Sequence, residues 1–206
     1  MNETVYVVDD DPDVLDAIAF LLENEGYGVT PFSEPRPLLE QVDANSRGCL
    51  ILDVRLPEMD GLQLLEALRD RGVAMPAVFI SGHGDIPLAV RAGQAGARGG
   101  LGKPIRDEVL LDKVQYGLEL DREAHHSHAE RAVIEARLDE LTPRERDVME
   151  GMIEGKLNKL IGHDLDVSVR TVEVHRANVL DKLRARNSSD MVRMVLSTER
   201  YKDWLL

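Results

Sequence analysis

Side chains capable of phosphoryl or metal chemistry stand at the ends of four short segments in the first half of the chain. They comprise three carboxylates, one hydroxyl and one ammonium group, contributed by Asp9, Asp10, Asp53, Ser81 and Lys103. If the segments are parallel strands of one sheet, their carboxyl ends meet at one edge, where open parallel sheets bind their ligands. We therefore expect these five side chains to form a single pocket.

The chemistry of such a pocket follows from its charges. Three adjacent carboxylates repel one another and do not all ionise easily. Mg²⁺ relieves this repulsion, since it prefers a few carboxylates, a carbonyl and waters, and it leaves a position for a phosphoryl oxygen. One carboxylate can then act as a nucleophile and form an acyl phosphate. Asp53 is the candidate nucleophile because it stands alone before a turn, whereas the adjacent Asp9 and Asp10 suit metal binding.

The other two groups suit the remaining phosphoryl oxygens, which Lys103 and the Ser81 hydroxyl would hold. Each residue alone has an ordinary interpretation. An acidic pair after a strand usually caps a helix, a serine often forms a turn, and Lys103-Pro104 is typical of a surface loop. The combination of complementary groups at four segment ends favours the functional interpretation.

The elements that must position these groups are predicted from the pattern of apolar residues. Short β-branched runs alternate with amphipathic stretches, which predicts a parallel, doubly wound α/β sheet. The expected strands cover residues 4–8, 29–32, 49–52, 77–80 and 100–103, and the expected helices cover residues 13–25, 33–42, 61–71 and 86–95. Ser33 is the expected cap of the second helix. The fifth strand is assigned by position, because its glycine-rich sequence has almost no β propensity.

The chain is helical in pattern from Ile105 onward. A long helix is expected to leave the sheet domain as a linker. Thr142-Pro143-Arg144-Glu145 then forms a strong helix start, with a capping threonine, a proline at the first position and a glutamate three residues after the cap. Three further helices follow, separated by turns near Gly155, Asp166 and Asn187. The predicted domains are residues 1–120, a helical linker over 121–140, and residues 141–206.

A tight turn at Asp166-Val167 separates the second and third of these helices, as in a helix-turn-helix unit, whose third helix enters the major groove. The core face of the third helix is expected to contain Val172, Val179, Leu180 and Leu183. Its opposite face has side chains that can read base edges or hold phosphates. Lys159, at the start of the preceding helix, suits a further phosphate contact. Periodicity alone leaves open an ordinary amphipathic helix with a solvated face.

Charge is distributed unevenly along the chain. The whole chain carries a net charge of −13, yet residues 141–206 contain 12 basic and 11 acidic residues. Only this part would tolerate a polyanion such as DNA. So small a positive charge predicts weak binding by a monomer, and hence paired half-sites bound by a dimer.

Composition also bears on location and on other ligands. Cys49 is the single cysteine and lies in an apolar run, which predicts a buried thiol and fits a reducing cytoplasm. No signal peptide and no apolar run of about 18 residues is found, so no membrane partner is expected. His125, His126 and His128 are close together, but no cluster of known spacing completes a metal site. A solvated linker is therefore the favoured interpretation of these histidines.

The first half of the chain resembles the receiver domain of FixJ-type response regulators. The resemblance rests on Val7-Val8-Asp9-Asp10-Asp11, Leu52-Asp53-Val54-Arg55-Leu56-Pro57, Ile80-Ser81-Gly82-His83-Gly84-Asp85 and Lys103-Pro104. It implies a flavodoxin-like receiver with a five-stranded parallel sheet of order 2-1-3-4-5. It also implies that a sensor histidine kinase phosphorylates Asp53.

The same resemblance implies the roles of the neighbouring residues. Mg²⁺ would be held by Asp10, Asp53 and the main-chain carbonyl of Arg55, with Asp9 acting through water. Ser81 would rotate toward the phosphate and Lys103 would pair with it. The Lys103-Pro104 bond is commonly cis in this family. The receiver would catalyse only its own phosphoryl transfer and dephosphorylation, so the protein is not expected to be an enzyme in any other sense.

Residues 141–200 resemble the LuxR/NarL-type effector domain, an all-α four-helix helix-turn-helix domain. The matching motifs are Leu141-Thr142-Pro143-Arg144-Glu145, Asn158-Lys159-Leu160-Ile161 and Arg170-Thr171-Val172-Glu173-Val174-His175-Arg176. The DNA contacts implied are Lys159, Arg170, Thr171, Glu173, Val174, His175, Arg176 and Lys182. The whole chain thus resembles a two-component response regulator in which phosphorylation controls homodimerisation and binding to double-stranded promoter DNA, with RNA polymerase as a further partner.

Two glycines depart from these family patterns. Gly100 replaces an aromatic residue that is usual on the fifth strand and whose rotamer follows the serine or threonine at the position of Ser81. The chemistry at Asp53 does not need that ring, so the sequence supports phosphorylation more directly than it supports the family's usual route from phosphorylation to dimerisation. Gly162 replaces a usual alanine, which would weaken its helix by up to about 1 kcal/mol.

The residues leave two alternatives to a phosphorylation-controlled regulator. In the first, the protein binds DNA independently of phosphorylation and uses its receiver as a dimerisation module, an interpretation that Gly100 keeps open. The second is an Mg²⁺-dependent phosphohydrolase, but such enzymes usually carry a second acid two residues after the nucleophile, where this chain has Arg55.

Overall fold

The computed structural model of the chain describes residues 3–82 and 100–204. The chain divides into two compact units, Met1–Ala124 and His125–Leu206. Among the helices of these described ranges, none combines the length and the apolar character that a membrane span requires. The helix predicted over residues 86–95 lies outside the described residues.

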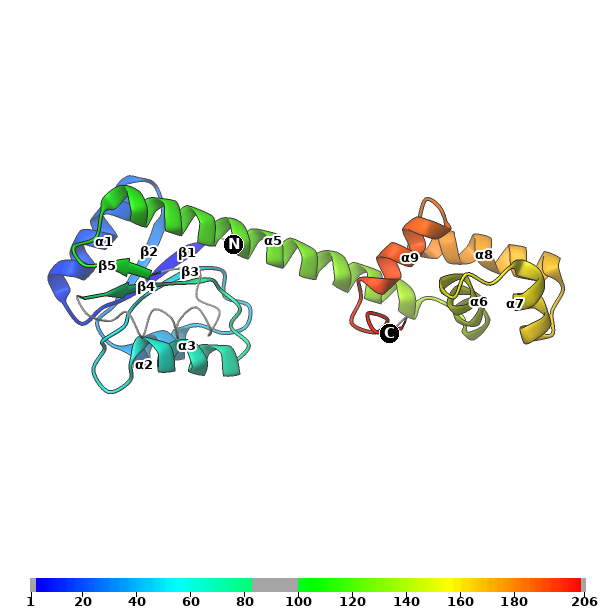
Figure 1. Cartoon of the computed structure of the whole chain (residues 1–206), viewed down its shortest axis with the longest axis horizontal. Coiled ribbons are helices and arrows are strands. Elements are labelled where there is room, and N and C mark those ends of the chain that lie inside the picture. Colours follow the sequence, from blue (N-terminus) through cyan, green and yellow to red (C-terminus); the bar gives the residue numbers. More distant parts are fainter. Residues whose placement is uncertain (1–2, 83–99, 205–206) are drawn as a thin grey trace. The chain divides into compact units, whose positions relative to one another are not determined.

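The N-terminal unit is built on a five-stranded parallel sheet whose order, β2-β1-β3-β4-β5, is the predicted one (Figure 1). The strands are β1 (Thr4–Val8), β2 (Gly28–Phe32), β3 (Gly48–Asp53), β4 (Ala77–Ser81) and β5 (Gly100–Gly102). The short β5 pairs with β4 in the register Ile80 to Leu101 and Ser81 to Gly102. Backbone pairing therefore forms the fifth strand although its side chains have little β propensity.

Helices cover both faces of this sheet (Figure 1). One face is covered by α1 (Pro12–Asn24) and the first part of α5 (Asp107–Asp139), and the other by α2 (Pro35–Gln41) and α3 (Gly61–Asp70). Asp11 caps α1 by accepting a hydrogen bond from the N–H of Asp13. The predicted cap of α2 is wrong, because Glu34 and not Ser33 precedes its first turn. Pro35, with its fixed φ, begins that helix and sets its boundary.

Helix α5 approaches the sheet closely at Cys49, which is fully buried as predicted. A Cβ atom on Gly117 would lie only 2.7 Å from Cys49 Sγ, so the absence of a side chain at residue 117 permits this approach. Burial raises the pKa of the Cys49 thiol to about 12, and the nearby Asp121 carboxylate acts in the same direction.

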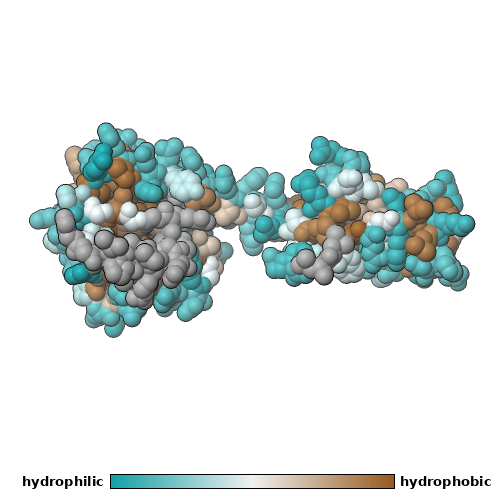
Figure 2. All heavy atoms as spheres, in the orientation of Figure 1, coloured by the Kyte–Doolittle hydropathy of each residue, from teal (hydrophilic) through white to brown (hydrophobic). Residues whose placement is uncertain are grey.

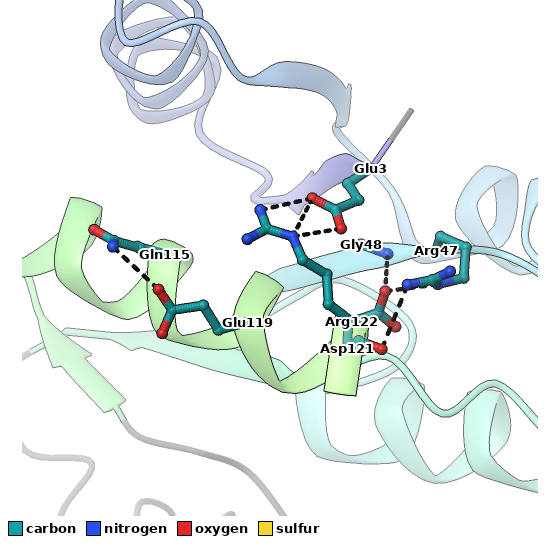
Figure 3. A network of polar contacts seen from close by, with 7 residues as sticks. All are labelled: Glu3, Arg47, Gly48, Gln115, Glu119, Asp121 and Arg122. Atoms are coloured by element: carbon teal, nitrogen blue, oxygen red, sulfur yellow. Dashed lines mark hydrogen bonds and ion pairs between the residues drawn. The ribbon is translucent and has the colours of Figure 1, made fainter. Parts of the chain in front are cut away.

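Two arginine–carboxylate contacts join α5 to the amino ends of β1 and β3 (Figure 3). Arg47 Nε donates to Asp121 Oδ2 over 2.7 Å, and the N–H of Gly48 donates to the same oxygen over 3.3 Å. Arg122 Nε and Nη2 donate to the Glu3 carboxylate over 2.7 and 2.8 Å. Asp121 is buried, whereas Arg122 is exposed, so the first contact is the less screened by solvent.

The C-terminal unit has only helices and turns over its described residues, and it contains the four helices predicted for a helix-turn-helix domain. These are α6 (Pro143–Ile153), α7 (Asn158–Leu165), α8 (Val169–Leu183) and α9 (Ser188–Leu196). Thr142 and Glu145 form the predicted capping box at the start of α6. Ser168 and Asn187 cap α8 and α9 through their side chains.

The last turns of α5 belong to the core of this second unit. Leu138 is fully buried, Ile134 is nearly so, and both belong to an apolar cluster that includes Val172 of α8. Residues 122–133 of the same helix are exposed, apart from the half-buried Ser127. The sequence predicts residues 121–140 as one linker, but Asp121 is buried in the N-terminal unit, the turns after it are exposed, and the last turns pack in the second core.

Candidate functional site

Three carboxylates meet at the carboxyl ends of β1 and β3. Asp9 and Asp10 follow β1, Asp53 ends β3, and the two strands are neighbours in the sheet. One oxygen from each carboxylate lies within 4.8 Å of the others. Asp9 and Asp53 are buried, whereas Asp10 is exposed. The structure thus brings together the three acids that the sequence singles out, with one of them open to solvent.

Lys103 reaches the same cluster from the end of β5. Its Nζ lies 2.8 Å from Asp9 Oδ2 and 2.9 Å from Asp53 Oδ2. The N–H of Lys103 donates to the carbonyl of Ser81 over 2.8 Å, which fixes the end of β5 beside the end of β4. The Lys103-Pro104 peptide bond is cis, and the half-buried Ser81 stands at the end of its strand. The lysine is therefore in direct contact with the acids, and Ser81 lies on the adjoining strand.

The electrostatics of the cluster leave it short of positive charge. Burial raises the pKa of Asp9, and the Asp53 carboxylate adds to this, against the opposing effects of Lys103 and the N–H of Asp11. Burial alone would lower the pKa of Lys103, but its contacts with Asp9 and Asp53 outweigh that effect and raise it. Among the described residues, the buried Asp9 Oδ2 has no hydrogen-bond partner beyond its ion pair with Lys103. Three carboxylates facing one ammonium group make an all-oxygen set that fits a hard divalent cation.

A close backbone contact fixes the position of Asp53. The N–H of Gly61 donates to the carbonyl of Val54 over 3.1 Å, and Asp60 caps α3 through a capping box with Gln63. A Cβ atom on Gly61 would lie 2.2 Å from the Asp53 carbonyl oxygen. Glycine at this position therefore allows the start of α3 to pack against the backbone of Asp53. The sequence predicts Gly61 as a helix start but carries no signal of this contact.

Helix α8 has the amphipathic arrangement predicted for a recognition helix. Val172, Val179 and Leu183 are fully buried, and Leu180 is partly buried against the same cluster. The opposite side of the helix exposes Arg170, Glu173 and Val174, and Thr171, His175, Arg176 and Lys182 are half-buried. Lys159 is exposed at the start of α7. Figure 2 shows apolar patches in the largely hydrophilic surface of this unit.

Protein contacts already hold several of the predicted DNA-binding side chains. Thr171 Oγ1 lies 2.8 Å from Ser168 Oγ, and Arg176 Nη2 donates to Ser188 Oγ over 3.1 Å. Arg170 Nη1 is 3.6 Å from Glu173 Oε2 on the exposed side. These short-range contacts preorganise the face without burying it.

The turn between α7 and α8 explains the glycine at residue 162. Asp166 ends α7 in the left-handed conformation, with φ 54°, and the N–H of Val167 donates to the Gly162 carbonyl over 2.9 Å. A Cβ atom on Gly162 would lie 2.8 Å from the Val167 carbonyl oxygen. Gly162 lowers the intrinsic helix propensity of α7, but it lets the turn after α7 close tightly. Helix propensity alone does not reveal this second role.

A receiver-type sheet with an acidic pocket, followed in one chain by a helix-turn-helix unit, defines a response regulator that acts on transcription. This chain belongs to that family. The model of the response regulator receiver domain matches residues 5–115, and the model of bacterial regulatory proteins of the luxR family matches residues 139–195.

The similarity to known proteins extends over nearly the full length of the chain. The transcriptional regulatory protein FixJ of Bradyrhizobium diazoefficiens is 40% identical over 97% of both chains. The response regulator protein TodT of Pseudomonas putida is 40% identical over 98% of this chain and 87% of its own. Among solved structures, the response regulator StyR matches 95% of this chain and 98% of its own with a TM-score of 0.83 and 38% identity. The crystal structure of full-length FixJ from B. japonicum matches 95% of this chain and 96% of its own, with a TM-score of 0.60 and 40% identity.

Proposed function

We propose that Asp53 is the phosphoacceptor of this response regulator and that a sensor histidine kinase is the donor. The observation that carries the proposal is that Asp53 ends the central strand β3 while its Oδ2 lies 2.9 Å from Lys103 Nζ. A carboxylate oxygen of Asp53 forms a bond to phosphorus as the bond from phosphorus to the donor's histidine nitrogen breaks. Lys103 then pairs with a phosphoryl oxygen, and the Ser81 hydroxyl donates to another.

The acidic cluster is also the proposed site for Mg²⁺. Asp10, Asp53 and the main-chain carbonyl of Arg55 would hold the ion, with Asp9 acting through water. When bound, Mg²⁺ supplies positive charge that offsets the charge of the phosphoryl oxygens. The three carboxylates, whose oxygens lie within 4.8 Å of one another and face a single ammonium group, support this assignment.

The proposed output is promoter binding in the cytoplasm by a homodimer that forms on phosphorylation, with RNA polymerase as the next partner. Helix α8 enters the major groove, and two such helices read paired half-sites. The proposed contacts are Lys159, Arg170, Thr171, Glu173, Val174, His175 and Arg176. Gly100 carries no ring, so phosphorylation promotes dimerisation by a route other than an aromatic rotamer on β5.

Chemical mapping of the phosphorylated residue tests the proposal directly. The full chain is incubated with acetyl phosphate and Mg²⁺ and then treated with borohydride, which reduces an aspartyl phosphate to homoserine. Peptide mass spectrometry is expected to find homoserine at residue 53 in wild type. Homoserine at another aspartate, or at none, would contradict the assignment.

Gly61→Ala is expected to slow phosphorylation by acetyl phosphate by about 100-fold, because a reacting group displaced by about 1 Å loses that much rate. The displacement follows from the 2.2 Å approach that the new Cβ atom would make to the Asp53 carbonyl oxygen. The rate is measured by intact-protein mass spectrometry at a temperature where circular dichroism shows the variant folded.

Gly48→Ala is the matched control for this experiment. Its Cβ atom would lie 1.8 Å from the Thr4 carbonyl oxygen, at the opposite end of β3 from Asp53. It should lower the unfolding temperature but leave the phosphorylation rate of the folded protein near that of wild type. Equal rate losses in both variants would mean that Gly61 acts only through stability.

Lys159→Ala is expected to weaken duplex DNA binding about equally on all sequences. The reason is that an exposed lysine at a helix start binds phosphate rather than bases. The slope of log K against log salt concentration should become shallower by about 0.9, as for the loss of one phosphate contact. Fluorescence anisotropy over a salt series measures this slope. The control variant Lys113→Ala, in the N-terminal unit, should leave the slope unchanged.

A further inference from the structure

The last turn of α8 is tied to the segment where α5 ends and α6 begins. Lys182 Nζ lies 2.7 Å from Glu145 Oε2 and donates to the carbonyl of Glu140 over 3.1 Å. One residue further along α8, the carbonyl of Leu183 accepts a hydrogen bond from Arg137 Nη1 over 3.1 Å. Three cation-to-oxygen contacts, two from Lys182 and one from Arg137, thus hold the carboxyl end of the helix proposed to read DNA.

The Glu145 carboxylate is buried and binds partners from both α8 and the start of α6. Its side chain is only 5% exposed, and the N–H of Thr142 donates to the same Oε2 over 2.9 Å. Burial alone would raise the pKa of Glu145, but Lys182 and the Thr142 N–H outweigh it and lower the pKa to about 2. The carboxylate therefore stays ionised at neutral pH and needs a cation beside it.

We propose that Lys182 is a positioning residue, which with Glu145 fixes the carboxyl end of α8 against the start of α6 and makes no contact with DNA phosphate. This inference rests on the proposed DNA binding by α8, and it replaces the expectation from sequence that Lys182 is a DNA contact. The Glu145–Lys182 pair sets the angle at which α8 is presented.

The burial of Glu145 argues against a phosphate contact. To reach a phosphate, Lys182 would have to leave a carboxylate that has almost no access to water. Breaking one half of a buried pair is strongly unfavourable because it leaves an uncompensated charge. Lys159 is exposed and does not face that penalty.

Lys182→Met and Glu145→Gln separate positioning from direct contact. Methionine keeps most of the lysine stem, and glutamine keeps the capping box with Thr142, so both variants should fold. Each full-length protein, with Mg²⁺ and beryllofluoride, is titrated with a fluorescent duplex of random sequence over a salt series. We expect each variant to bind several-fold more weakly than wild type with an unchanged salt slope, and the double variant to bind no more weakly than either single one.

Other outcomes would overturn the proposal. A slope shallower by about 0.9 in Lys182→Met, as expected for Lys159→Ala, would make Lys182 a phosphate contact. Unchanged affinity in both variants, together with lower unfolding temperatures, would make the pair a purely structural one. Failure of wild type to bind duplex at low salt would reject the proposed function and this inference together, whereas the first two results would reject the inference alone.

The pH dependence of stability gives a readout that does not involve DNA. The pKa of Glu145 in the folded protein, about 2, is below its ordinary value of 4.5. Its contribution to stability is therefore fully present above pH 4.5 and is lost as the pH falls toward 2. The difference in unfolding temperature between wild type and Glu145→Gln should shrink over that range, and a constant difference would contradict an ionised, paired Glu145.

Discussion

Asp53→Asn should abolish the monomer-to-dimer shift that we expect wild type to make in the presence of Mg²⁺ and beryllofluoride, which mimics a phosphoryl group on a carboxylate. The amide removes the carboxylate oxygen that we propose accepts the phosphoryl group, and with it one of the three carboxylates that lie within 4.8 Å of one another. Sedimentation velocity of the full chain measures the shift. The effect should be complete rather than graded, because no other described residue combines contact with Lys103 and the central position of β3.

Asp11→Asn is the matched control. Asp11 adjoins the cluster but accepts a hydrogen bond from the N–H of Asp13 as the cap of α1, and asparagine caps equally well. This variant should dimerise like wild type. A dimer in both wild type and Asp53→Asn without beryllofluoride would favour the alternative in which the receiver is a constitutive dimerisation module. No dimer under any condition would mean that the switch does not act through assembly.

Leu138→Ala should destabilise the C-terminal unit by about 2–5 kcal/mol, the range for truncating a buried leucine. Leu138 is fully buried beside α6 and α8, and its carbonyl accepts a hydrogen bond from Arg146 over 2.8 Å. Urea unfolding can be followed by the fluorescence of Trp204, the only tryptophan of the chain. Its ring lies 5.2 Å from that of the buried Tyr201, so it reports on this core.

Val133→Ala provides the comparison on the same helix. Val133 is 49% exposed, and its truncation should change the unfolding free energy by no more than about 0.5 kcal/mol. Equal effects of the two truncations would show that the end of α5 is a linker rather than part of the core.

The receiver fold could be predicted in detail because its signals are local. Short apolar runs with acids directly after them fix both the strands and the sheet edge at which Asp9, Asp10 and Asp53 meet. Only β5 had to be assigned by position, since Gly100 and Gly102 have no side chains to show strand character. The sequence favours Ser33 as the cap of α2, one residue before the observed Glu34, because serine is a favourable cap whereas Pro35 decides where the helix begins.

The features that could not be predicted depend on contacts between distant residues. The approach of Gly61 to the Asp53 carbonyl depends on how α3 packs against β3. Glu145 and Lys182 are separated by 37 residues, and each has a sufficient local explanation, as a capping residue and as a polar residue on an amphipathic helix. In the same way, the burial of Leu138 depends on α6 and α8, so helical periodicity alone does not separate it from the exposed turns before it.

The buried thiol beside Gly117 has a practical consequence for spectroscopy. Because burial raises the pKa of Cys49 to about 12, its thiol is protonated at neutral pH, and thiolates rather than thiols react with maleimides. A cysteine introduced at an exposed position, such as Val133 of α5, would be labelled far faster. Spin labels or fluorophores can therefore be attached singly without removing the native cysteine, and the dimer proposed to form on phosphorylation can be sought by distance measurements on an otherwise unaltered protein.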